Sequence, residues 1–271
     1  MPKIAFLDTE VQPTTGKVLD IGVVNGKGEI LHTSSIAEAE DFLKDAEYIC
    51  GHNIIDHDLT YLDKALDRQF CENSRFIDTL HLSPLLFPKK PYHNLVKDDK
   101  LQTDELNNPV NDAQKTKDLL NDEVAAFINL GAPLRSILVD LLKDSIYFDS
   151  FFDFTQQSEV EQEVSKKVME LYSDKICNNV DLVKIGKKHP IGFAYALTLI
   201  GSGHPNSVTP PWVLHRFPEV ERIMFQLRSN PCIQGCPYCK KAFSWSLPSY
   251  AAFVNGKVKS PDFRKDKPPL F

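Results

Sequence analysis

Two acidic residues near the N-terminus are spaced to share one face of a β-strand. Asp8 and Glu10 lie two residues apart in the segment Ile-Ala-Phe-Leu-Asp-Thr-Glu, residues 4–10. Side chains on a strand alternate between its faces, so both carboxylates would point away from the side that holds Leu7 and Thr9. Like charges held this close repel unless a cation or an opposite charge lies between them. The pair therefore predicts a cation site; the simpler alternative is a strand that ends in a polar turn.

Two further carboxylates stand at the predicted starts of helices. Asp58 begins the segment Asp-Leu-Thr-Tyr-Leu, in which Tyr61 and Leu62 follow three and four residues later and so share its side of a helix. Asp112 lies in the first turn of a long helix that we expect to begin after Asn108, where the helix dipole favours a negative charge. Each of these acids alone would be an ordinary capping residue.

Three of the six cysteines form the pattern Cys232-x-x-x-Cys236-x-x-Cys239. Thiolates favour tetrahedral zinc, which would need a fourth ligand. The candidates for this ligand are His215, His204 and Cys177. Unligated thiols are a second interpretation. An iron–sulfur cluster is a third, because the spacing matches the loop of radical-SAM enzymes, but that loop lies near the start of a large barrel and only a short segment follows here.

Composition and charge restrict the classes of protein to consider. The chain has 271 residues, 42% of them hydrophobic and 25% charged, which is typical of a globular protein. Its net charge of −6 gives no overall basic surface for nucleic acid, although the segment after residue 226 is basic. No apolar run approaches the roughly 20 residues that span a bilayer, and six cysteines are too sparse for a disulfide framework. We therefore expect a cytoplasmic protein with reduced thiols and no membrane segment.

The elements that must position the acidic residues follow from the apolar patterns. Strands are predicted at residues 3–8, 17–24, 29–34, 48–50 and 75–80, the first three as a meander. Helical spacing of apolar residues separates the later strands, which predicts an α/β domain with a mixed sheet and helices on both faces. After residue 132 the pattern becomes mainly helical. The aromatic run at residues 146–154 favours core packing over a base-stacking surface, because acidic residues lie between the rings.

The acidic residues and their order resemble the DnaQ-like branch of the DEDD family of 3′–5′ exonucleases. The motifs are Leu7-Asp8-Thr9-Glu10, then His52-Asn53 followed by Asp58-Leu59-Thr60-Tyr61-Leu62, and last Asn111-Asp112-Ala113. Asp56 competes with Asp58 in the second motif, and the Asp-Leu-x-Tyr-Leu pattern favours Asp58. The resemblance covers residues 1–130 and implies a ribonuclease H-like fold.

The resemblance also implies a role for each residue. Asp8, Glu10, Asp58 and Asp112 would hold two Mg²⁺ or Mn²⁺ ions, which hydrolyse a phosphodiester bond by activating water and compensating charge. Asp8 would bridge both ions, Glu10 and Asp112 would hold the ion that carries the water, and Asp58 would complete the site. The residues expected to contact substrate are Thr9, His52, Asn53 and Tyr61.

One position departs from the family pattern. Members carry a histidine five residues, or a tyrosine four residues, before the last aspartate, and these positions here are Asn107 and Asn108. An amide can orient a water molecule but cannot take its proton. Three explanations stay open: the metals alone form hydroxide and the enzyme is slow, His93 or another histidine is brought in from a neighbouring loop, or the domain has lost catalysis and only binds.

The chain also resembles the N-terminal region of bacterial RecQ-like helicases that carry a fused exonuclease. The segment Pro210-Pro211-Trp212-Val213-Leu214 and the cysteines after it support this comparison, but no Walker A motif is present, so no helicase activity is expected here. We predict an exonuclease domain at 1–130, a helical accessory region at 131–225 and a cysteine-containing basic tail at 226–271. The predicted function is 3′–5′ digestion of DNA in repair or replication, on single-stranded 3′ ends and with a fused or separate helicase partner. The alternative is a catalytically degenerate module that binds nucleic acid or docks onto a helicase.

Overall fold

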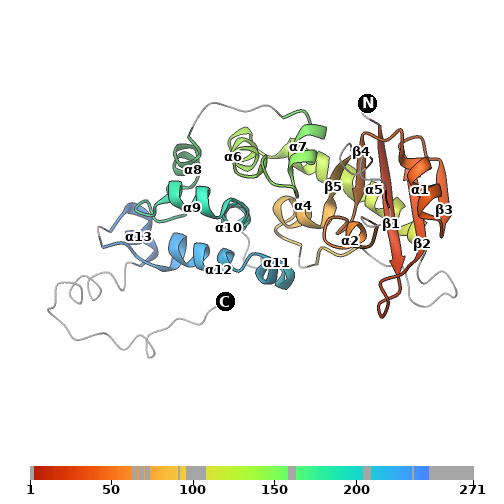
Figure 1. The fold of residues 1–271 in the computed structure, drawn as a ribbon. Helices are drawn as coiled ribbons and strands as arrows, with labels where there is room; N and C mark the ends of the chain where they lie inside the picture. The colour runs from red at the N-terminus through yellow and green to blue at the C-terminus, as the bar shows by residue number, and fades with distance from the viewer. Residues whose placement is uncertain are drawn as a thin grey trace. The chain divides into compact units, whose positions relative to one another are not determined.

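The computed structural model describes residues 3–62, 66, 70, 74–90, 92–95, 108–157, 163–203, 209–233 and 235–243 (Figure 1). The chain forms two compact units. The first comprises residues 1–131 and 142–159, and the second comprises residues 132–141 and 160–271. The chain thus leaves the first unit for ten residues and then returns to it. The helical region predicted at 131–225 is thus divided, because residues 142–159 belong to the first unit.

Five strands form one mixed sheet in the first unit. They are β1 (Ile4–Val11), β2 (Val18–Asn25), β3 (Ile30–Thr33), β4 (Tyr48–Gly51) and β5 (Arg75–Asp78). Their order across the sheet is β3-β2-β1-β4-β5. The first three pair antiparallel, and β4 and β5 run parallel to β1. The predicted α/β class with a mixed sheet is confirmed.

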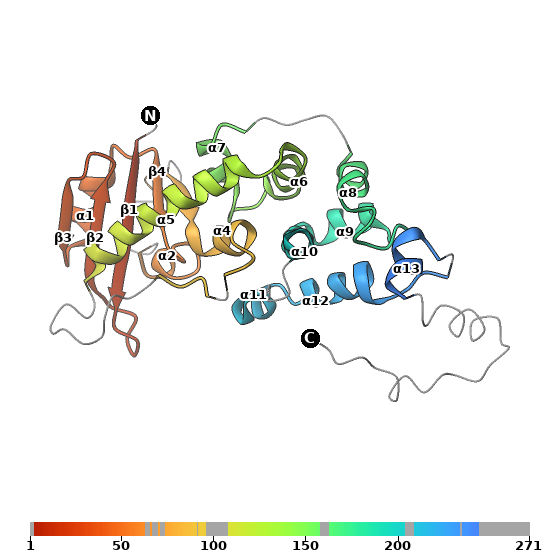
Figure 2. The ribbon, with the colours of Figure 1, turned by 180° about the vertical axis from the view of Figure 1, so that it is seen from behind.

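Helices cover both faces of this sheet, as the sequence predicts. Ala5 and Leu7 of β1 pack in an apolar cluster with α1 (Ile36–Leu43) and with Leu62 of α2 (Asp58–Leu62). The alternation along β1 therefore turns Phe6, Asp8 and Glu10 to the other face. The long helix α5 (Pro109–Asn129) crosses that face over β1 and β2 (Figure 2).

The predicted strand at 75–80 ends two residues early, because Asp78 begins a helix. The Asp78 carboxylate accepts a hydrogen bond from the backbone N–H of Leu80 and so caps α4 (Thr79–Leu86). The same carboxylate accepts the N–H groups of Asn53 and Ile55 at 3.0 and 3.1 Å. Burial raises the pKa of Asp78 to about 7, while these backbone hydrogen bonds lower it. Asp78 thus ties the loop after β4 to the end of β5.

The aromatic run packs in the core of the first unit. Phe151 and Phe152 of α7 (Asp149–Phe154) lie 5.3 and 5.6 Å from the ring of Phe127 on α5, measured between ring centroids. Asp153, which lies between the rings in the sequence, pairs with Arg75 at the start of β5. Core packing is therefore the correct interpretation of this run. The core to which it belongs is that of the first unit, which contains the sheet, and not that of the helical second unit.

The regular elements described in the second unit are all helices, joined by loops. Its helices are α6 (Ala132–Leu142), α8 (Val164–Tyr172), α9 (Leu182–Lys188), α10 (Pro190–Ser202), α11 (Pro211–Arg216), α12 (Glu219–Met224), the π-helix η1 (Phe225–Ser229) and α13 (Pro237–Ala242). Helix α10 is buried along most of its length and packs against α9 and α12. The buried Lys167 of α8 donates to Ser136 of α6 at 2.7 Å and pairs with Asp140 of the same helix.

Candidate metal centre

Three of the four predicted acidic residues meet on one face of the sheet. Asp8, Glu10 and Asp112 each offer a carboxylate oxygen, and these oxygens lie within 4.8 Å of one another. Asp8 and Glu10 come from alternate positions of β1, and Asp112 comes from the first turn of α5, which covers their face. The strand period of two and the placement of α5 therefore bring together residues that are far apart in the sequence.

The start of α5 is held against the sheet by local contacts. Asn108 caps the helix by accepting the N–H of Val110 at 3.0 Å, and Pro109 occupies the first turn, where no N–H is needed. Gly22 of β2, which pairs with Asp8, faces this turn so closely that a Cβ atom there would lie 2.2 Å from the Val110 nitrogen. The absence of a side chain at residue 22 thus lets Asp112 approach Asp8.

The charge of this group is suited to a divalent cation. Three half-buried carboxylates converge, and Lys115 lies 3.8 Å from Asp112 on the same helix. Carboxylate oxygens are the ligands that Mg²⁺ and Mn²⁺ prefer. The donor set therefore fits the hard cation that the sequence predicts.

Asp58 lies outside this group of three. It is 1% exposed, and its Oδ1 accepts hydrogen bonds from the Thr9 backbone N–H at 2.9 Å and from the Thr9 hydroxyl at 2.6 Å. Thr9 faces the side of the sheet that carries α2, and the pairing of β1 with β4 ends at Phe6. The edge of β1 beyond Phe6 is therefore open to Asp58, which fixes the strand between Asp8 and Glu10.

Asp56, the competing acid of the second motif, has other partners. Its carboxylate lies 3.2 Å from the His81 ring and accepts a hydrogen bond from the Tyr147 hydroxyl at 3.2 Å. The rings of His81 and Tyr147 are themselves in contact, with centroids 4.1 Å apart. Asp56 thus links α4 to residues 142–159, where the chain returns to the first unit.

The residues predicted to contact substrate also make contacts or take up special backbone conformations within the protein. Thr9 is buried against Asp58, as described above. His52 contacts the Thr79 hydroxyl at 2.9 Å through Nδ1, and burial lowers its pKa to about 4, so its ring is neutral at pH 7. Asn53 has a positive φ of 70°, which asparagine tolerates well. Tyr61 packs on Gly16, and Asn107 lies outside the described residues.

His57 is a further candidate residue, which the structure places beside Asp58. Its Nδ1 lies 3.8 Å from Oδ2 of Asp58, its side chain is 45% exposed, and its ring packs edge-on against Tyr61. Contact with Asp58 raises the pKa of His57, burial opposes this shift, and the charge of Glu10 adds to it. The only available signal was its position directly before Asp58.

The three clustered cysteines meet a fourth. The Sγ atoms of Cys177, Cys232, Cys236 and Cys239 lie within 4.8 Å of one another. Of the three proposed fourth ligands, Cys177 is therefore the one that the structure brings to the cluster. His215 lies on α11 and is not part of this group, and His204 is outside the described residues.

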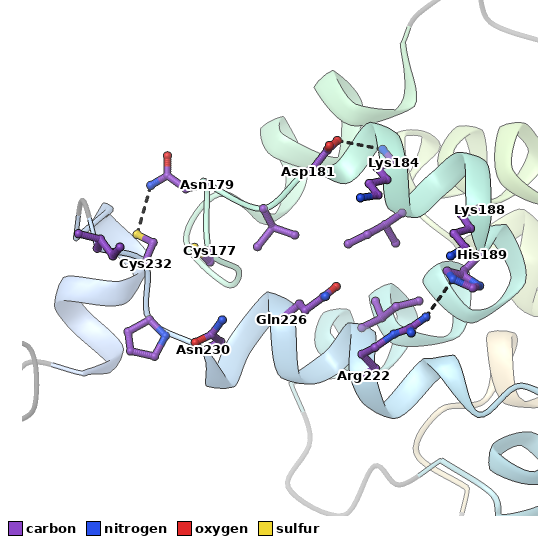
Figure 3. A pocket seen from close by; sticks show the side chains of 15 residues that line it. Cys177, Asn179, Asp181, Lys184, Lys188, His189, Arg222, Gln226, Asn230 and Cys232 are labelled. Atoms are coloured by element: carbon purple, nitrogen blue, oxygen red, sulfur yellow. Dashed lines mark hydrogen bonds between the residues drawn. The ribbon is translucent and has the colours of Figure 1, made fainter. Parts of the chain in front are cut away.

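A cavity of about 620 Å³ lies beside these cysteines in the second unit. Figure 3 shows Cys177, Asn179 and Cys232 at one end and Lys188, His189 and Arg222 at the other. Arg222 contacts the His189 ring at 2.9 Å. The described residues of the lining contain three cationic side chains against one carboxylate, that of Asp181, which caps α9 through the N–H of Lys184.

Comparisons of this chain with protein-family models, with curated proteins and with solved structures found no match. The resemblance noted from the sequence thus rests on the motif residues alone. Among the described residues, no single helix is both long and apolar enough to cross a membrane; one bent pair of successive helices, α5 with α6, passes that test by length and composition.

Proposed function

We propose that the first unit is a metal-dependent 3′–5′ exonuclease of the DnaQ-like DEDD class, with a ribonuclease H-like fold and DNA as substrate. The observation that carries the proposal is the meeting of Asp8, Glu10 and Asp112 at one face of the sheet. The strand order, with three antiparallel strands followed by two that run parallel to β1, is compatible with this fold.

The acidic group provides what phosphodiester hydrolysis requires of a protein. Divalent ions at such a site supply a hydroxide nucleophile and compensate charge on the attacking and leaving oxygens. Asp8, Glu10 and Asp112 would hold these ions, and the rigid β1 strand and the capped start of α5 orient the three carboxylates. Asp58 supports the arrangement by fixing Thr9 between Asp8 and Glu10.

His57 is our candidate for the missing general base. It is half exposed, and its Nδ1 lies 3.8 Å from the Asp58 carboxylate, which in turn holds Thr9 between Asp8 and Glu10. A neutral histidine can accept a proton from water, which asparagine at position 107 cannot. Because contact with Asp58 raises the pKa of His57, its neutral form is favoured at a higher pH than for an ordinary histidine. We propose a single-stranded DNA 3′ end as substrate and a RecQ-like helicase as partner, in a cytoplasmic repair or replication role.

The second candidate function is a degenerate nuclease fold that only binds nucleic acid or docks onto a helicase. Two observations favour it. Asn107 and Asn108 replace the usual base, and Asp58 lies outside the group that the other three acids form. Both candidates keep the same fold, so turnover must distinguish them.

Digestion of 5′-labelled single-stranded DNA tests the proposal. We expect the wild-type protein to shorten the DNA from its 3′ end with Mg²⁺ or Mn²⁺, and EDTA to stop the reaction. Asp8→Asn should abolish the products, because it removes one ligand charge without changing the size of the side chain.

The matched control is Asp41→Asn, because Asp41 is exposed on α1 and pairs only with Lys44 three residues on among the ion pairs described. This variant should digest DNA as the wild type does. A folded wild-type protein that gives no products with either metal would overturn the exonuclease and favour the binding module. Fluorescence anisotropy with labelled single-stranded DNA would then measure the affinity that this alternative requires.

A further inference from the structure

The four cysteines of the second unit come from two separate segments. Cys177 lies in the loop between α8 and α9, whereas Cys232 precedes α13, Cys236 caps it and Cys239 lies in its first turn. All four are free thiols, so no disulfide joins any two of them. Two stretches of chain 55 residues apart thus deliver their sulfur atoms to one place.

The local backbone is arranged around the sulfur atoms. Backbone N–H groups donate to them: Cys236 to Cys232 at 3.2 Å, Asn178 to Cys236 at 3.4 Å and Cys232 to Cys239 at 3.5 Å. The Asn179 side chain donates to Cys232 at 3.2 Å (Figure 3). Such donors stabilise negative charge on sulfur, which is the form that binds metals.

A tight turn positions the thiols of Cys236 and Cys239. The N–H of Gly235 donates to the carbonyl of Cys232 at 3.1 Å, and Gly235 has a φ of 63°, which few residues other than glycine adopt. The turn folds Cys236 back toward Cys232. Helix α13 then begins at once and carries Cys239 to the same side.

The spacing of the sulfur atoms fits a single ion. Zinc binds thiolate at about 2.3 Å, so four sulfurs at the corners of a tetrahedron lie about 3.8 Å apart. The sulfurs here lie within 4.8 Å of one another, so small movements complete that geometry. The cubane of an iron–sulfur cluster has one iron atom for each cysteine and holds the four cysteine sulfurs farther apart than one ion does.

The cysteines also form most of the apolar core at this end of the unit. Among the described residues, the cluster contains Cys177, Cys236, Cys239 and Tyr238, and Val180, Cys232 and Phe243 pack against it. So small a core supplies little free energy of folding, and small cores in proteins commonly depend on a bound metal. The position of α13 therefore needs a further source of stability.

We propose that Cys177, Cys232, Cys236 and Cys239 bind one zinc ion that fixes α13 to the loop before α9. This structural site is independent of the acidic group and of the proposed nuclease activity. Because Cys177 and Cys232 also line the basic cavity, the ion would hold one end of that cavity in shape.

The first measurement is the metal content of the whole chain, purified under reducing conditions. We expect one zinc per chain and neither iron nor acid-labile sulfide. Cobalt(II) exchanged for zinc should give the strong sulfur-to-metal absorption and visible bands of a tetrahedral thiolate site. Iron with sulfide, or a folded protein that takes up neither zinc nor cobalt, would overturn the proposal.

Variants then identify the ligands. Cys177→Ser should lose the tetrathiolate cobalt spectrum, and Cys177→His should give a shifted spectrum with fewer thiolates while keeping the metal. Cys50→Ala removes a buried thiol from β4 of the first unit and should leave zinc content unchanged. If Cys177→Ser keeps the wild-type spectrum, Cys177 is not the fourth ligand.

The wild-type measurements stand even if a variant fails to fold. Asp8→Asn should retain its zinc whether or not the chain digests DNA. Failure of the exonuclease test and failure of the zinc test are therefore separate results.

Discussion

Glu123 of α5 carries a fully buried carboxyl group in the first unit. It is 0% exposed, and neither carboxylate oxygen has a hydrogen-bond partner among the described residues. Burial raises its pKa well above the ordinary value, the charge of Asp78 raises it further, and Lys90 opposes the shift. A carboxyl group that is protonated in the native state and ionised in the unfolded state makes stability fall as pH rises above about 4.5.

We therefore expect Glu123→Leu to stabilise the protein at pH 7 by about 1–3 kcal/mol, because it removes a buried polar group without a partner. The gain should shrink as pH falls toward 4.5, where the wild-type group is protonated in both states. Urea denaturation at several pH values measures both effects. Glu221→Gln, at an exposed position, should leave the pH dependence unchanged. A gain that does not vary with pH would mean that the carboxyl group ionises at the same pH in the native and unfolded states, so that its native pKa is not raised.

Asp112 and Asp58 have different surroundings and should respond differently to substitution. Asp112→Asn should weaken Mn²⁺ binding by at least about 10–100-fold, which is the loss of affinity typical when a residue that supports a metal ligand is replaced. Asp58→Ala leaves two buried donors of Thr9 unpaired and should cost about 1–3 kcal/mol of stability. Calorimetry measures the first change and denaturation the second.

The same pair of variants tests the role of Asp58 as a metal ligand. If Asp58→Ala, while folded, weakens Mn²⁺ binding as strongly as Asp112→Asn does, Asp58 is a ligand, as the family resemblance implies. An unchanged affinity would show that it acts by holding Thr9.

Most of this site could be predicted from the sequence, because local patterns along the chain mark the positions of its acidic residues. Two residues of spacing place Asp8 and Glu10 on one strand face, and the cap before Asp112 marks the start of a helix. The placement of Asp58 could not be predicted, since it depends on where the pairing of β1 with β4 ends. Cys177 could not be selected over the two histidines, because only the folded chain brings its loop to α13.

At the scale of elements, the contact between β2 and α5 decides whether the acidic group forms. Gly22→Ala would place a Cβ atom 2.2 Å from the Val110 nitrogen and 2.3 Å from the Pro109 carbonyl carbon. Both are backbone atoms, so the helix itself must move away. We expect a loss of about 1–3 kcal/mol in stability, together with weaker Mn²⁺ binding, since Asp112 moves with the helix.

Gly186→Ala is the matched control for this prediction. Gly186 lies in α9, and the nearest atom to an added Cβ, on Leu141, is at 3.5 Å, an ordinary contact. Alanine is also the better helix former, so stability should stay the same or rise. If Gly22→Ala binds Mn²⁺ as tightly as the wild type does, the start of α5 is not fixed in the way described.

The elements were predicted more reliably than their grouping into units. Short apolar and β-branched runs indicate β1 to β5, and helical spacing indicates α5 and α10. Nothing in the local pattern of residues 146–154 shows that Phe151 and Phe152 pack on Phe127 instead of in the second unit, because an aromatic run is apolar in either place.

At the scale of the molecule, the return of residues 142–159 to the first unit determines which fragments can fold. A fragment of residues 1–131 lacks Phe151 and Phe152 and leaves Phe127 uncovered at one end of α5. We expect it to bind a hydrophobic dye and to unfold at lower urea than a fragment of residues 1–157. Equal stability of the two fragments would show that α7 contributes nothing to the core of the first unit.

The same path has a consequence during synthesis. Proteins emerge from the ribosome N-terminus first, and their domains fold as units. The whole sheet and all three converging carboxylates are made before residue 131, whereas the rings that cover Phe127 follow only after α6. The nascent chain therefore passes through a stage in which its sheet is complete and one end of α5 is bare. We expect chaperones to bind the nascent chain at that point.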